Sequence, residues 1–204
     1  MTMAEFHPQK ILIINIFGIG DVLFTTPIIR NIKLAAPKAF IGYVCNKRTA
    51  EILSNNPDID RVYVYEKDDF EALWKISKIK FFKAAQNFLN QVKKERYDLS
   101  IDVSLNKYAG FFTWAVGIKT RIGFDYKKRG FWLTKKIKLV GYEGKHVIDF
   151  YLDLLSQIGI PVKEKGIKLF MKREDQQWAE NFLKAEGVNP SDRLVAFIPG
   201  GGAS

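Results

Sequence analysis

One acidic side chain, Asp21, follows a strand-like run and a glycine loop, a position at which side chains can do chemistry. Ile11–Ile16 is a nearly unbroken apolar run rich in β-branched residues, which is typical of a strand buried on both faces of a parallel sheet. Gly18 and Gly20 allow a tight turn, and apolar residues then repeat at helical spacing as far as Pro37. Ligands of such sheets bind beyond the carboxyl ends of the strands, so Asp21 is placed to take a proton or hold a ligand.

The glycine loop matches neither of the common phosphate-binding loops. A dinucleotide fingerprint needs a third glycine where Leu23 stands, and a P-loop needs a Gly-Lys-Ser/Thr sequence that is missing here. Aspartate is also a preferred residue at the start of a helix, where its carboxylate accepts backbone N–H groups. The residues alone therefore leave two roles open for Asp21, a helix cap and a catalytic base, and one residue can fill both.

The segment Gly20–Pro27 (GDVLFTTP), followed by Ile28–Arg30, resembles the amino-terminal signature of the family 9 glycosyltransferases, which include the lipopolysaccharide heptosyltransferases. Three weaker similarities agree with it, namely NPDIDRVYVY at 56–65, YDLSIDVSLNKYAG at 97–110 and IKTRIGFD at 118–125. The resemblance implies a GT-B fold, in which the first of two Rossmann-like domains holds the acceptor and the second holds the nucleotide-sugar. It also implies that Asp21 is the catalytic base.

The expected fold class is α/β, of GT-B type, with a Rossmann-like parallel sheet flanked by helices. Residues 1–8 are expected to form a loose tail, and 9–187 an acceptor-side domain that ends in a linker helix. Leu194–Ile198 reads as a new buried strand that leads into the glycine loop 199–204. Residues 188–204 would then begin a second Rossmann-like domain that is truncated, so we expect residues 1–204 alone to fold but not to transfer sugar.

Polar residues at the predicted strand ends complete the expected site. A sugar acceptor needs hydrogen-bonding groups, and several lie beside the Asp21 loop if the strands are neighbours. Asn106 could instead cap the helix 107–117, Lys107 could be merely solvated, and His146 could make a structural contact. With the resemblance, the predicted acceptor-binding residues are Gly20, Thr25, Ser104, Asn106, Lys107, Arg121 and His146, and the predicted donor-binding residues are Gly200, Gly201, Gly202 and Ser204.

The net charge of +10 on 204 residues favours an anionic partner. The segment 127–138 carries six basic residues and no acidic one, with Phe131 and Trp132 between them. This composition suits nucleic acid or lipid headgroups equally well, but no nucleic-acid motif accompanies it, so an acidic glycolipid or an anionic membrane surface is the expected partner. Phe70–Lys94 is also basic and aromatic; we expect its aromatic side chains to face the core, with membrane contact as the alternative.

The composition argues against several other kinds of site. The single cysteine, Cys45, cannot form an internal disulfide, and no His/Asp/Glu cluster has metal-ligand spacing, so neither a metal nor another cofactor is expected. There is no serine nucleophile elbow, no apolar run of membrane-spanning length and no signal-peptide pattern. A cytoplasmic location follows as an expectation, with peripheral attachment to the inner face of the membrane.

Taken with the resemblance, the sequence predicts an inverting, metal-independent glycosyltransferase. Its expected donor is a nucleotide-sugar, ADP-heptose by resemblance, and its expected acceptor is the lipopolysaccharide core or a related acidic glycolipid. One alternative is a sugar-nucleotide epimerase that shares the fold. The other, from a different class, is a nonenzymatic nucleic-acid-binding module, which the positive charge alone would favour.

Overall fold

The computed structural model describes residues 8–197, and its main part is a six-stranded, fully parallel sheet. The strand order is β3-β2-β1-β4-β5-β6, the doubly wound order of a Rossmann sheet. The strands are β1 (Lys10–Ile14), β2 (Phe40–Cys45), β3 (Arg61–Val64), β4 (Leu99–Asp102), β5 (Thr120–Tyr126) and β6 (Lys135–Leu139). The helices are α1 (Ile19–Phe24), α2 (Thr26–Ala35), α3 (Lys47–Ser54), α4 (Lys67–Ile76), α5 (Lys78–Lys93), α6 (Lys107–Val116), α7 (Val147–Ser156) and α8 (Arg173–Ala185).

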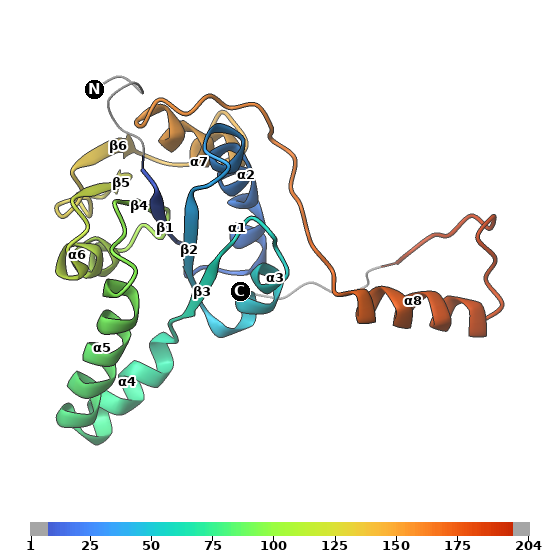
Figure 1. Cartoon of the computed structure of the whole chain (residues 1–204), viewed down its shortest axis with the longest axis horizontal. Helices are drawn as coiled ribbons and strands as arrows, with labels where there is room; N and C mark the ends of the chain where they lie inside the picture. The colour runs from blue at the N-terminus through green and yellow to red at the C-terminus, as the bar shows by residue number, and fades with distance from the viewer. Residues whose placement is uncertain (1–7, 198–204) are drawn as a thin grey trace. The chain divides into compact units, whose positions relative to one another are not determined.

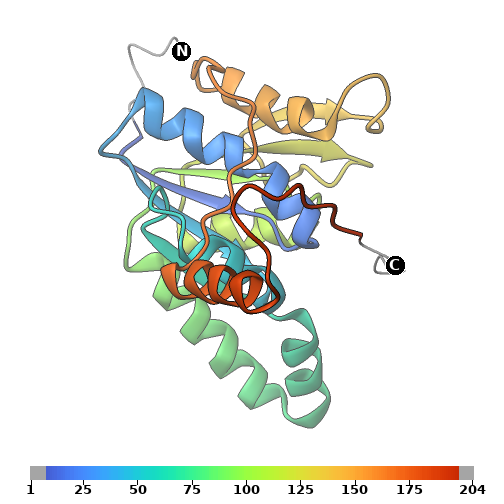
Figure 2. The same cartoon turned by 90° about the vertical axis from the view of Figure 1, so that its right-hand side faces the viewer.

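Helices cover both faces of the sheet (Figures 1 and 2). Alternate residues of the central strand enter two separate cores, one on each face. Ile11 and Ile13 pack with apolar side chains of α1, α2, α3 and α7, whereas Leu12 and Ile14 pack with those of α5 and α6. Both sets are nearly or fully inaccessible to solvent. This two-sided burial explains why β1 is an unbroken apolar run, and it confirms the predicted α/β class with a parallel sheet.

Two local differences from the predicted elements have clear causes. The single helix expected after Asp21 is two helices, because Thr25 separates α1 from α2 and Pro27 lies in the first turn of the latter. The basic stretch after β5 contains a sixth strand, β6, in parallel register with β5. The sequence did not predict this strand because three of its five residues are lysines. Charged side chains are common in a strand at the edge of a sheet, which is where β6 lies.

The predicted strand at Leu194–Ile198 was wrong within the described residues. Residues 167–171 and 194–197 are irregular, and Ile198 and the glycine loop after it lie outside the described part of the chain. A strand needs a neighbour to bind its backbone groups, and neither segment has one among residues 8–197.

The chain divides into two compact units, the first ending at Phe170 and the second beginning at Met171. In the first unit, the segment after α7 is held by Asn31, whose side chain binds the backbone of Lys163 and Glu164. The described part of the second unit contains α8, on which Trp178 and Phe182 stack with ring centroids 5.4 Å apart. The linker helix predicted at the end of residues 9–187 is thereby confirmed as α8.

Candidate active site

Asp21 lies in the first turn of α1, directly beyond the carboxyl end of β1. The N-cap of α1 is Gly18, so Asp21 is not the cap residue that one interpretation made it. Its carboxylate is partly exposed and makes no hydrogen bond or ion pair with any residue between 8 and 197. An acidic side chain with no structural partner, at the ligand-binding edge of the sheet, remains available to act on a bound molecule.

Two buried asparagines that sequence reasoning missed hold the loop between β1 and α1. Asn15 donates from Nδ2 to the Asp21 carbonyl at 3.0 Å and accepts the Phe17 N–H at 3.0 Å. Asn46, just after β2, donates to the carbonyls of Ile16 and Phe17 at 3.2 and 2.7 Å. Each asparagine directly follows an apolar strand, and a buried amide there must find backbone partners. An asparagine directly after an apolar strand is therefore the sequence feature that could have identified both residues.

Tyrosines of α7 and of the loop before it lie close enough to Asp21 to feel its charge. Burial, with a smaller contribution from the negative charge of Asp21, raises the pKa of Tyr142 and of Tyr151 above the usual range. The rings of these two tyrosines are edge to face, with centroids 6.4 Å apart. Tyr142 is exposed, with 39% of its surface open to solvent, whereas Tyr151 is buried.

Ser104 and Asp102 lie at the carboxyl end of β4, which is the direct neighbour of β1. Asp102 pairs with Ile14 in the sheet register, so the predicted adjacency of this polar strand end to the Asp21 loop is confirmed. Asp102 Oδ1 accepts the Ser104 N–H at 2.8 Å and the Ser104 hydroxyl at 2.6 Å. Burial raises the pKa of Asp102 to about 6, although the bonds from Ser104 oppose the rise.

We expect Asp102 to make the native state less stable as pH rises from about 4 to about 6. The unfolded chain releases this proton near pH 3.8, whereas the native state keeps it to about pH 6. Because the native state binds more protons in this window, the free energy of unfolding falls by about 3 kcal/mol across it. Asp102→Asn keeps the oxygen that accepts from Ser104, so it should remove this fall, as measured by urea unfolding at a series of pH values.

Asp125→Asn is the control, because Asp125 changes the stability with pH in the direction opposite to Asp102. The Gly130 N–H and Lys136 hold the pKa of Asp125 below its usual range, so this carboxylate stabilises the native state above the usual aspartate pKa and less at acid pH. An Asp102→Asn variant with the wild-type slope between pH 4 and 6 would show that Asp102 does not carry the proton.

Four of the predicted acceptor-binding residues form a buried pair and an exposed pair. Thr25 is fully buried and Ser104 nearly so, and Thr25 Oγ1 contacts the Tyr43 hydroxyl at 2.5 Å, so both shape the site from beneath. Gly20 and Lys107 are exposed, with Lys107 Nζ 5.2 Å from the centre of the Tyr108 ring. The exposed pair can touch a ligand directly, whereas the buried pair cannot without movement.

Asn106 and His146 each cap a helix, as the structural alternatives predicted. Asn106 Oδ1 accepts the Tyr108 N–H at 2.9 Å, and His146 Nδ1 accepts the Ile148 N–H at 3.2 Å. The His146 ring also contacts Phe24 edge to face at 5.2 Å, which places it beside the helix that carries Asp21. Its Nε2 makes no hydrogen bond with another described residue and can still bind a ligand.

Arg121 is not brought to the site. It lies near the amino end of β5, and its guanidinium donates to the carbonyls of Trp132 and Ile118, both at 2.6 Å. The structure thus gives Arg121 a structural role at the amino ends of the strands, whereas Asp21 lies beyond their carboxyl ends. The four predicted donor residues, Gly200, Gly201, Gly202 and Ser204, lie outside the described residues.

A basic hollow opens at the carboxyl end of β5 and β6, on the same edge of the sheet as Asp21. Lys127 and Lys128 have positive φ angles of 49° and 61°, so the chain turns sharply here and presents both side chains. Lys136 forms an ion pair with Asp125 at 3.2 Å. Asp125 is the one acidic residue that lines the hollow. The hollow is lined by Asp125, Lys127, Lys128, Lys136, Lys138 and Leu139. Its surplus of positive charge suits an anion.

The family model described as "Glycosyltransferase family 9 (heptosyltransferase)" matches residues 86–203, more than half of the chain. The chain belongs to glycosyltransferase family 9. Lipopolysaccharide heptosyltransferase 3 of Escherichia coli is 28% identical over 143 residues, which are 69% of this chain and 40% of that protein. The lipopolysaccharide core heptosyltransferase OpsX of Haemophilus influenzae is 22% identical over 90% of this chain and 50% of its own length. The chain thus spans about half the length of these relatives or less.

Solved structures of the same family share the fold. A glycosyl transferase family 9 protein from Veillonella parvula superposes with a TM-score of 0.71 at 22% identity, over 94% of this chain and 55% of that one. The E. coli heptosyltransferase WaaC with ADP-2-deoxy-2-fluoro heptose gives a TM-score of 0.66 at 18% identity, over 76% and 50%. The predicted GT-B-type class of this family 9 chain is confirmed by these similarities and by its own sheet.

The described residues contain neither a metal-binding cluster nor a membrane-spanning helix. No group of three or more His, Cys, Asp or Glu side chains between residues 8 and 197 could hold a metal ion. In the same part of the chain, no helix is both long and apolar enough to pass through a bilayer.

Proposed function

We propose that this protein is the acceptor-binding part of an inverting glycosyltransferase that transfers heptose from ADP-heptose to a lipopolysaccharide core or a related acidic glycolipid. The observation that carries the proposal is the carboxylate of Asp21, which lies at the carboxyl end of the sheet and has no partner among residues 8–197. Membership of family 9 supports the reaction class. The relative WaaC, solved with an ADP-heptose analogue, supports the donor.

In the proposed reaction, Asp21 takes the proton of an acceptor hydroxyl. The oxygen forms a bond to the anomeric carbon of the sugar from the side opposite to the diphosphate, and the bond from that carbon to the diphosphate oxygen breaks. ADP leaves with the bonding electrons, and the configuration at the anomeric carbon inverts. Asn15 and Asn46 act as positioning residues, since they hold the loop that carries the base.

We further propose a division of labour along the chain. Residues 9–187 would bind the acceptor, with Gly20, Lys107, Tyr142 and His146 as the accessible hydrogen-bonding groups around Asp21. Residues 188–204 would begin the donor domain, where Gly200, Gly201, Gly202 and Ser204 approach the diphosphate. An acceptor made at the cytoplasmic face of the membrane would place the protein there.

The test is a transfer assay with the full-length protein, ADP-heptose and a lipopolysaccharide inner-core acceptor, followed by mass spectrometry of the glycolipid. A mass increase of one heptose is expected, and only when both substrates are present. Conversion of the donor to an isomer without any acceptor would instead identify an epimerase. Salt-sensitive binding to arbitrary DNA, without any reaction of the donor, would point to the nucleic-acid-binding alternative.

The basic hollow gives a prediction about the acceptor. Replacing both Lys127 and Lys128 with glutamine should raise the KM for a phosphorylated acceptor about tenfold and leave kcat largely unchanged, because two charge-assisted contacts to the acceptor are lost. The effect should be small for the same acceptor after phosphatase treatment. Steady-state kinetics with the paired acceptors measures both.

The matched control removes two positive charges from the opposite edge of the sheet. Lys38 and Lys119 are exposed and lie just before β2 and β5, at the amino ends of these strands. Lys38→Gln with Lys119→Gln makes the same change in net charge and should leave the KM near the wild-type value. Equal effects of the two double variants would assign the change to overall charge and not to the hollow.

A further inference from the structure

The hairpin of α4 and α5 extends away from the sheet, as both views of the chain show (Figures 1 and 2). α4 begins three residues after the end of β3, so the hairpin leaves the sheet from the edge that also carries Asp21. Ser77 alone links the two helices. All ten residues of α4 are described and none is fully buried, and the helix packs chiefly against α5.

Aromatic side chains fill the inner part of the hairpin and are exposed at its outer part. Phe70 contacts Phe81 and Phe88 edge to face, with ring centroids 6.1 and 6.3 Å apart, and all three are partly buried. Of these rings, Phe88 packs against the core on one face of the sheet, as expected. The aromatic side chains exposed at the turn, Trp74 and Phe82, contradict that expectation. At the turn, the large apolar side chains are exposed: Trp74 by 46%, Ile76 by 73%, Ile79 by 80% and Phe82 by 61%.

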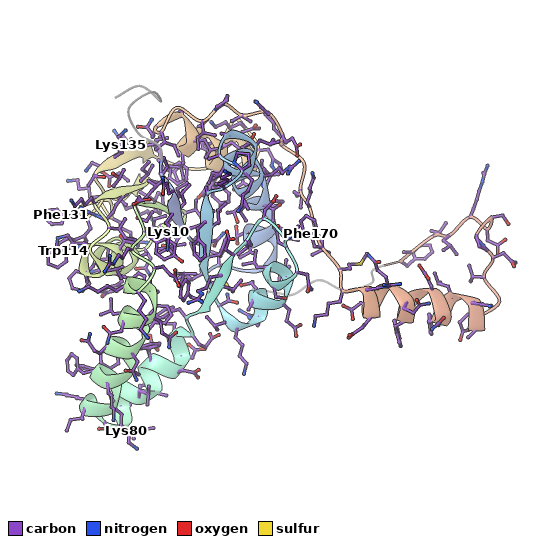
Figure 3. The ribbon with its side chains drawn as sticks, viewed as in Figure 1. Lys10, Lys80, Trp114, Phe131, Lys135 and Phe170 are labelled. Carbon is purple, nitrogen blue, oxygen red and sulfur yellow. The ribbon has the colours of Figure 1, made fainter. Side chains whose placement is uncertain are left out.

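The exposed apolar tip is surrounded by positive charge only. Between Glu71 and Glu95 the chain has six lysines and no acidic residue. Four of these lysines, Lys75, Lys78, Lys80 and Lys83, are exposed around the turn, and Lys80 is labelled at the far end of the hairpin in Figure 3. Lys78 Nζ lies 5.4 Å from the centre of the Trp74 ring.

We propose that the α4–α5 tip, defined as residues 74–83, inserts into the interface of an anionic lipid bilayer. Apolar side chains on a projecting turn can enter the acyl boundary while the lysines bind anionic headgroups, and tryptophan is favoured at that depth. A second protein surface would have to be acidic and concave to cover such a tip. The tip carries four exposed lysines and no acidic residue, which favours an anionic bilayer as its binding partner.

Insertion would also orient the site. The hairpin and the Asp21 loop leave the same edge of the sheet, so a bilayer bound at the tip would lie on the side from which a lipid-linked acceptor reaches Asp21. α4 has ten residues and rises about 15 Å, a distance comparable to a few sugar units. This use of the tip rests on the proposed function, whereas bilayer binding itself does not.

The test is flotation of the full chain with vesicles of 30% phosphatidylglycerol in phosphatidylcholine, and with vesicles of phosphatidylcholine alone. Binding to the anionic vesicles only is expected. Replacing Ile76, Ile79 and Phe82 with serine should lower the partition coefficient more than tenfold, on the order expected for losing exposed apolar area that would be buried. Lys78→Gln with Lys80→Gln should lower it about fivefold per lysine, and high salt should remove that difference.

The control is a variant that loses exposed apolar side chains elsewhere, Phe131→Ser with Val140→Ser, which are 79% and 83% exposed. It should bind vesicles like the wild type. Loss of binding in this variant, with binding kept in the tip variant, would overturn the proposal and assign the membrane contact to the basic segment 127–138. A tip that instead mediates self-association would appear as a dimer in light scattering that the serine variant abolishes, without vesicle binding, and would equally overturn it.

A depth measurement separates insertion from surface attraction. A polarity-sensitive dye on Lys80→Cys should shift to the blue with anionic vesicles, whereas the same dye on Ser54→Cys, at the exposed end of α3, should not. The native thiol, Cys45, is buried and will not compete for the label. Equal spectra at both sites on bound protein would contradict insertion. Vesicle binding with a blue shift but without sugar transfer would leave the tip assignment standing and count only against the proposed function.

Discussion

Replacing Asp21 with asparagine is expected to reduce sugar transfer by the full-length protein about 10³-fold, the scale of losing a general base. The amide is almost the same size as the carboxylate but cannot take a proton from the acceptor. The carboxylate makes no hydrogen bond or ion pair with the described residues, so the loop, held by Asn15 and Asn46, should keep its geometry. The expected loss is therefore in kcat, with nearly unchanged donor affinity and thermal stability.

The measurement is initial rate with ADP-heptose and an inner-core acceptor, together with calorimetric donor binding and a thermal melt. Asp69→Asn is a suitable control, since Asp69 is also an exposed acidic residue in the first turn of a helix, α4. It should transfer at the wild-type rate. A rate within a few-fold of wild type for Asp21→Asn would remove the catalytic assignment.

Replacing Gly123 with alanine is expected to lower the free energy of unfolding by about 3 kcal/mol. An added Cβ at Gly123, in the middle of β5, would lie 2.6 Å from the Asp102 carbonyl oxygen and 3.1 Å from Leu133 Cδ1. The first of these atoms is backbone in the neighbouring strand and cannot rotate away. The strands must therefore separate at the point where β4 delivers Asp102 and Ser104 to the site.

Urea unfolding of the variant measures the loss, with Gly141→Ala as the control. A Cβ on Gly141 would meet nothing within 4 Å, and this glycine lies outside the sheet, after β6. The control should unfold within about 0.5 kcal/mol of the wild type. Equal stabilities of the two alanine variants would mean that the sheet relaxes at β5 without cost.

Residue periodicity determined most of the secondary structure. The apolar runs that became β1 and β2 are buried on both faces, and such runs have few alternatives to a parallel sheet. The segment His146–Gly159 has a capping histidine, apolar residues at helical spacing and a terminal glycine, and it forms α7. The position of Asp21 at a strand-to-helix turn followed from the same local pattern.

Edge and terminal elements could not be read in this way. β6 alternates lysine with apolar residues, a pattern that also fits an exposed loop, and its strand character comes from its pairing with β5. Residues 194–197 are apolar like a buried strand but stay irregular, since a strand forms only where a partner offers backbone groups. Both outcomes depend on long-range hydrogen bonding.

The site itself shows the same division. The sequence alone singled out the candidate functional residues, with Asp21 after its glycine loop and the lysines after β5. Only the tertiary structure decided which of them meet. The strand order put the end of β4 beside Asp21, while Arg121, two residues into β5, fell at the opposite edge. It also left the tip 74–83 in solvent. The spacing of apolar residues along the chain determines which face of each helix or strand is buried and where the element ends. The order of strands in the sheet depends instead on contacts between residues far apart in the chain.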